Sequence, residues 1–78
     1  MTTIFTSKRG EPITQVMLDA ARDAALEHGI DVSAEQIKTV LDVGLPYSMK
    51  SIPAAAAAAG LEEWVADVMA DSAIAAIE

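Results

Sequence analysis

Six consecutive alanines, Ala54 to Ala59, are the feature that most constrains the fold of this chain. Alanine is the best helix former and adds almost no bulk, so another helix can pack very close to such a segment. Pro53 is tolerated in the first turn of a helix, and Gly60 can supply the left-handed residue that ends one. We therefore expect a helix that begins near residues 51–53 and ends at Gly60.

The abundance of alanine also limits the core. Hydrophobic residues make up 53% of the 78 positions, but sixteen of them are alanine. Each alanine buries little area, and apolar burial contributes roughly 25 cal/mol per Å². We expect residues 1–78 to form a single small acidic domain of modest stability. A homodimer, or a partner that covers part of the surface, remains an open alternative.

The stretch "VSAEQI" marks the start of another helix. Ser33 is placed as an N-cap and Gln36 as its partner in a capping box, and Val32 and Ile37 occupy the positions of a hydrophobic staple. Gly44 is the expected end of this helix, because Pro46 just beyond it prevents continuation.

The N-terminal part predicts a strand and a further helix. Residues 3–7 are β-branched and aromatic and precede a plausible "KRGE" turn, so we expect a short strand that pairs with residues 10–13 or with another chain. Apolar residues then repeat at helical spacing over residues 14–28, and Gly29 supplies a left-handed stop.

The last predicted helix covers residues 61–77. Its apolar residues on one face are Leu61, Trp64, Val65 and Val68, and we expect Trp64 at the centre of the core, with an interface anchor as the alternative. Tyr47 and Met49, in the loop before the alanines, are expected to cover the core or to contact a partner. The predicted fold is mainly α: a compact four-helix domain with a short N-terminal β-strand or hairpin.

The spacing of Ala56, Gly60 and Leu61 also fits a helix-turn-helix, whose second helix would enter the major groove of DNA. The outward residues of that second helix are all acidic: Glu62, Glu63, Asp67 and Asp71. It contains no lysine or arginine, so a phosphate backbone would repel it. We predict no direct binding to nucleic acid.

The net charge of the chain is −7. The segment after Lys50 contains five acidic residues and no basic residue. Glu63, Asp67 and Asp71 are spaced by four, which places them about 6 Å apart along a helix at 1.5 Å per residue. A second row spaced by four consists of Asp19, Asp23 and Glu27. Like charges at this spacing destabilise a helix by roughly 0.2–0.5 kcal/mol per pair.

Two explanations of these rows are open. They are either ordinary solvated faces or a ladder of negative charge that resembles a nucleic-acid backbone to the basic groove of a partner. On the second interpretation, the candidate partner-binding residues are Glu62, Glu63, Asp67, Asp71, Asp19, Asp23 and Glu27.

The sequence favours no catalytic chemistry. It has no cysteine and none of the common nucleophile, zinc, calcium or phosphate-loop motifs. The only histidine, His28, falls in the last turn of a predicted helix, where the dipole stabilises a cation, and no second ligand stands at a motif spacing from it. We expect no enzyme activity, no metal and no cofactor. The longest uncharged run, residues 51–61, is far below the ~20 residues of a membrane helix, which predicts a soluble, cytoplasmic protein.

In length, charge and general character the whole chain resembles the small phage-encoded anti-CRISPR proteins, particularly those directed against type I multi-subunit effector complexes, with type I-C as one candidate. No residue is carried over by motif. The resemblance implies inhibition by binding, in the cytoplasm of the host cell, where an acidic face would occupy a basic surface that otherwise holds target DNA.

A second interpretation is a small phage or bacterial structural or assembly protein that self-associates through apolar faces. Ile74 and Ile77 motivate it, because both fall partly outside the face that contains Trp64.

Overall fold

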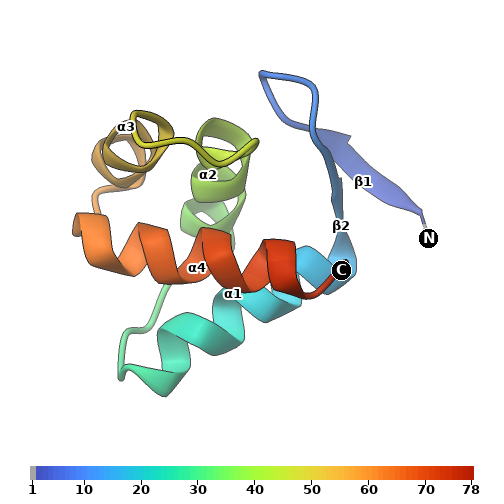
Figure 1. Ribbon diagram of the computed structural model, residues 1–78. Coiled ribbons are helices and arrows are strands. Elements are labelled where there is room, and N and C mark those ends of the chain that lie inside the picture. The colour runs from blue at the N-terminus through green and yellow to red at the C-terminus, as the bar shows by residue number, and fades with distance from the viewer. Residues whose placement is uncertain (1) are drawn as a thin grey trace.

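The computed structural model describes residues 2–78, and it is mainly helical with a hairpin at the N-terminus, as expected (Figure 1). The elements in chain order are β1 (Thr3–Thr6), β2 (Pro12–Thr14), α1 (Gln15–Glu27), α2 (Ala34–Gly44), α3 (Ser51–Ala59) and α4 (Glu63–Ala75). The expected fold class is confirmed. The last helix is shorter than predicted, since residues 61–62 and 76–77 lie outside it.

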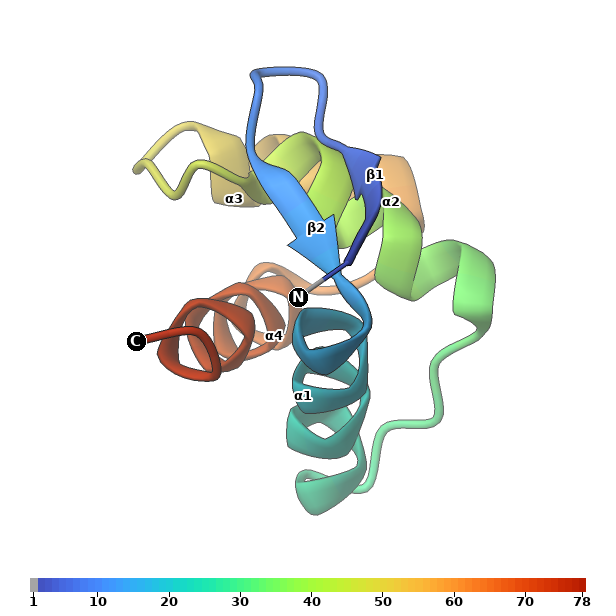
Figure 2. The same ribbon diagram turned by 90° about the vertical axis from the view of Figure 1, so that its right-hand side faces the viewer.

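The helices pack as two pairs. α1 lies against α4, and α2 lies against α3, while α4 also contacts α3 (Figures 1 and 2). The C-terminal end of α4 returns to the start of α1, so the first and last helices of the chain lie side by side (Figure 1). The close approach of α2 to α3 depends on small residues, because a Cβ atom added at Gly44 would lie 3.4 Å from the Cβ of Ala55.

The hairpin resolves the question of what pairs with the N-terminal strand. β1 runs antiparallel to β2 of the same chain, with Phe5 opposite Ile13 and Thr6 opposite Pro12. Ile13 is fully buried and Phe5 packs against the core, so the hairpin contributes one apolar side to the interior. The strand therefore pairs within the molecule.

Serine hydroxyls join the end of α2 to its neighbours. Ser7, which is buried, donates from Oγ to the carbonyl oxygen of Leu45 over 2.9 Å, and Ser51 donates to the carbonyl of Gly44 over 2.9 Å. The last carbonyls of a helix have no partner within it, so these two bonds satisfy groups that would otherwise be unpaired. The hairpin and the start of α3 are thereby held against the end of α2.

The local helix-end predictions are confirmed. The amide of Gln36 donates to Oγ of Ser33 over 3.1 Å, and the Gln36 side chain accepts from the amide of Ser33 over 2.9 Å, which completes the capping box. Gly29 and Gly60 adopt φ angles of +75° and +71°, the left-handed conformation expected after α1 and α3.

The expected place of Trp64 at the centre of the core is wrong. Its side chain is 45% exposed, and Val68 is only half-buried. The residues of α4 that are buried are Val65, Ala66, Met69, Ala70 and Ala73. Trp64 stands in the first turn of α4, beside the end of α1, where its ring meets His28 edge-on at 5.4 Å between centroids. The indole therefore lies at the edge of the contact between α1 and α4 and not inside it.

The loop before α3 contradicts one of the two expectations for its residues, namely that they cover the core. Met49 is 92% exposed and Tyr47 is 47% exposed, so neither covers the core. Leu45, which precedes them, is the buried residue of this segment.

Candidate partner-binding site

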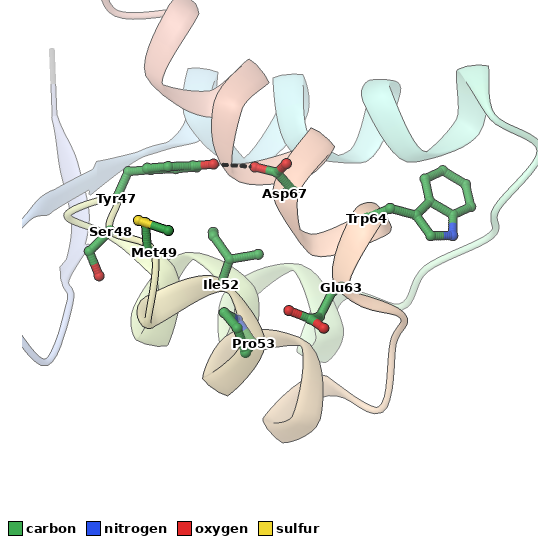
Figure 3. A pocket seen from close by; sticks show the side chains of 8 residues that line it. All are labelled: Tyr47, Ser48, Met49, Ile52, Pro53, Glu63, Trp64 and Asp67. Atoms are coloured by element: carbon green, nitrogen blue, oxygen red, sulfur yellow. Dashed lines mark hydrogen bonds between the residues drawn. The ribbon is translucent and has the colours of Figure 1, made fainter.

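A groove lies between the loop that follows α2, the start of α3 and the first turns of α4 (Figure 3). Its volume is about 340 Å³, and it is shallow and open along the surface. The residues that line it are Tyr47, Ser48, Met49, Ile52, Pro53, Glu63, Trp64 and Asp67.

Two serines set the loop on one side of the groove. The amide of Ser48 donates to Oγ of Ser51 over 2.9 Å, and the amide of Ser51 donates to Oγ of Ser48 over 3.0 Å. This reciprocal pair closes the turn that leads into α3, in the manner of a capping box. It leaves Met49, between the serines, pointing out of the turn into solvent.

A single hydrogen bond joins the loop to α4 across the groove. The hydroxyl of Tyr47 donates to Oδ1 of Asp67 over 2.5 Å (Figure 3). The carboxylate holds the phenolic proton, and burial together with the charges of Asp67 and Asp71 acts in the same direction, so the pKa of Tyr47 is raised above its ordinary value. Asp67 itself is half-buried.

The groove has an apolar side and an acidic side. Met49 and Pro53 are exposed, and Ile52 beneath them is buried and forms part of the floor. Glu63 and Asp67 of α4 face them (Figure 3). The groove is therefore a solvent-exposed surface that is apolar on one side and carries carboxylates along the other.

Trp64 marks one end of the site. Its ring is directed away from Met49 and Ile52 (Figure 3), toward the end of α1. The indole Nε1 donates to Oε2 of Glu62 over 2.6 Å, so the first of the predicted acidic residues of this segment holds the ring in place. Exposed tryptophan is unusual on a surface that has no partner, and it is enriched at the energetically important centres of interfaces.

The acidic row of α4 forms one surface. Glu63 and Asp71 are exposed and Asp67 lies between them, one turn from each. Two cations, Arg9 and Lys50, line a different depression with Val43 and Ala54. These two cations therefore do not line the groove that contains Glu63 and Asp67.

The acidic row of α1 is not brought to this groove. Asp19, Asp23 and Glu27 are exposed. Asp19 accepts a hydrogen bond from Gln15 over 3.0 Å and lies beside a separate depression that Arg22 and Lys38 also line. The two predicted rows therefore occupy different surfaces, and the row of α1 has cations next to it.

The sequence predicts the carboxylates of the site, and it offers partner contact as one alternative for Tyr47 and Met49. It does not place these two residues beside the carboxylates, and it assigns Pro53 only to the start of a helix. The available signal was the polar turn itself, in which Tyr47 precedes Ser48 and Met49 lies between Ser48 and Ser51.

The described part of the chain, residues 2–78, contains no group of three histidine, cysteine or acidic residues that could hold a metal ion. None of its helices combines the length and apolar character needed to span a bilayer. Comparison with protein-family models, with curated proteins and with solved structures found no match. The groove and its charged edge are therefore the observations on which a function can be argued.

Proposed function

We propose that the protein is a non-enzymatic inhibitor that binds a basic, nucleic-acid-binding surface of another protein or ribonucleoprotein complex. A type I CRISPR effector complex is the candidate target. The acidic face of α4 would occupy the place of DNA on that surface, and target DNA would be excluded. The observation that carries the proposal is the row of Glu63, Asp67 and Asp71 beside an open groove.

The distribution of charge supports this proposal. All carboxylates after residue 50 lie on a part of the chain that has no lysine or arginine, and the exposed members on α4 have the spacing of one turn. Their mutual repulsion lowers the stability of α4 and adds no packing. A partner rich in lysine and arginine would reverse that repulsion and would associate quickly, in a manner sensitive to salt.

The test is competition with DNA. Binding of a target duplex to a purified type I-C effector complex is measured while the protein is added, at low and at high salt. We expect the protein to displace the duplex at low salt and to lose this effect as salt rises. Displacement that is unchanged at high salt, or no displacement at all, contradicts the proposal for this target.

A variant that reverses the charge of the α4 row should leave Asp67 unchanged. Asp67 accepts the Tyr47 hydrogen bond, so its reversal would also disturb the loop. The double variant Glu63→Lys with Asp71→Lys changes only exposed residues. Its matched control is Asp31→Lys with Glu78→Lys, which changes net charge equally at exposed positions that do not line the groove. We expect the first to abolish competition and the second to leave it nearly unchanged.

The row of α1 provides a further comparison. Reversal of Asp19, Asp23 and Glu27 to lysine should reduce competition less than the α4 variant does, because cations already lie beside Asp19. A larger loss from the α1 variant would move the binding face to α1.

Self-association as a structural or assembly protein remains the second candidate. Ile77 is 43% exposed, although Ile74 packs against the core. Light scattering over a range of concentrations separates the two functions, since an assembly protein should form oligomers that persist at high salt, and an electrostatic inhibitor should stay monomeric.

A further inference from the structure

We infer that the groove between residues 45–50 and α4 holds an apolar side chain from the partner, and that this anchor is flanked in the partner by lysine or arginine. The inference rests on the proposed function and states what the bound segment must offer. It adds a hydrophobic contact to a surface that was otherwise defined by its charge.

The apolar side of the groove is the first reason. Met49 is almost fully in water, and Pro53 and half of Tyr47 are exposed with it. With Ile52, which is buried beneath them, these side chains line one side of the groove (Figure 3), here called the apolar strip. Methionine is flexible and polarisable, so its side chain can adapt to an inserted group. Covering this strip with an apolar side chain removes it from water.

The charges across the groove decide the chemistry of the residues beside that anchor. Glu63 and Asp67 face the strip, and Asp71 continues the row along α4. Lys50 and Arg9 lie around a different depression, so no cation among the lining residues offsets these carboxylates. Acidic flanks in a partner would be repelled, whereas lysine or arginine would be attracted.

The shape of the groove favours a segment of protein over a small molecule. Its volume of about 340 Å³ lies near the lower end of the range of roughly 300–1,000 Å³ for ligand sites. Because it is open, a small molecule would remain largely in water. A protein segment needs to insert only one or two side chains, and its backbone can continue past both ends of the groove.

Three labelled synthetic peptides of equal length test the inference. The first has a leucine and a phenylalanine flanked by lysines, the second replaces the two apolar residues by serine, and the third keeps them but replaces the lysines by glutamate. Affinity for the protein is measured by fluorescence anisotropy at low salt. We expect the first peptide to bind at least about tenfold more tightly than either of the others.

Variants of the protein place the anchor. Met49→Ser should weaken binding of the first peptide by about tenfold and leave binding of the serine peptide unchanged. The matched control is Leu26→Ser, at an aliphatic residue that is 45% exposed on α1. It should have no effect on either peptide. Circular dichroism confirms that both variants remain folded.

The outcomes separate this inference from the proposed function. Equal binding of the first and second peptides overturns the apolar anchor, yet it leaves the acidic face as a binding surface. Equal binding of the first and third peptides overturns the requirement for basic flanks. Binding that is unaffected by Met49→Ser, or no binding of the first peptide, also overturns the inference, whereas the proposed function is decided by competition with DNA.

Discussion

The hydroxyl of Tyr47 lies 2.5 Å from Oδ1 of Asp67 and donates a hydrogen bond to it, although the two residues are twenty positions apart in the chain. This bond connects the loop after α2 with the second turn of α4. Both residues line the groove, so the bond crosses it.

The titration of Tyr47 reports on this bond. Its hydrogen bond to Asp67 raises the pKa of Tyr47 above 10.0, and Asp67→Asn should bring that pKa back toward the ordinary value. A raised pKa in the folded state means that the stabilising contribution is complete below pH of about 10 and is lost as pH rises through the higher folded value. Tyr47 is the only tyrosine, so tyrosinate absorbance measures it directly. Asp19→Asn serves as the control, and an unchanged pKa in Asp67→Asn would contradict the assignment.

The exposed position of Trp64 predicts that its removal destabilises the protein less than the removal of a smaller, buried residue. Met69→Ala removes a fully buried side chain and should lower the free energy of unfolding by about 2–5 kcal/mol. Trp64→Ala removes a side chain that is nearly half exposed, so its cost should be smaller despite the larger size of the residue. Urea denaturation followed by circular dichroism compares the two variants. A greater loss from Trp64→Ala would show that the indole supports the core after all.

The Ser7 side chain should contribute more to the free energy of unfolding than its small size suggests. It is 4% exposed, donates to the carbonyl of Leu45 and accepts from the amide of Glu11, each over 2.9 Å. Ser7→Ala removes the partner of the buried Leu45 carbonyl and of the partly buried Glu11 amide, at a cost of about 1–3 kcal/mol. Thr6→Ala, at an exposed position of the same hairpin, should change the free energy of unfolding by no more than about 0.5 kcal/mol. Similar effects of the two changes in urea denaturation would argue against a role for the buried bonds.

Gly60 is required for its backbone conformation and not for space. Its φ is +71°, and an added Cβ would have no atom within 4 Å. Gly60→Ala should therefore destabilise the protein by about 1–2 kcal/mol through backbone strain alone. Gly60→Asn should cost less, because asparagine tolerates the left-handed region better. Equal unfolding free energies for the alanine and asparagine variants would contradict this explanation.

Much of the fold could be predicted from short stretches of the sequence. The capping box at Ser33 and Gln36, and the left-handed stops at Gly29 and Gly60, depend on hydrogen bonds and backbone angles within a few residues. The hairpin was predicted in type, but whether its partner strand came from the same chain depended on where the rest of the molecule would hold it.

The sequence predicted the charged residues of the candidate site and offered contact with a partner as one alternative for Tyr47, Met49 and Trp64, but it did not bring these residues together. The row on α4 follows from a spacing of four along one helix, which is a local property. The acidic row lies beside Tyr47, Met49 and Pro53 because α3 and α4 pack against α2, and because the turn formed by Ser48 and Ser51 directs Met49 outward.

The sequence by itself determined which segments form helices, where the capping box and the glycine stops lie, and which segments carry negative charge, because those properties arise from neighbouring residues. Only the tertiary structure decided that Trp64 stands outside the core, that the two acidic rows face different surfaces, and that an apolar strip lies beside one of them. The reason is physical: the buried face of a helix is set by the helices it meets, and Trp64 lies beside the end of α1, against His28, where its side chain stays 45% exposed.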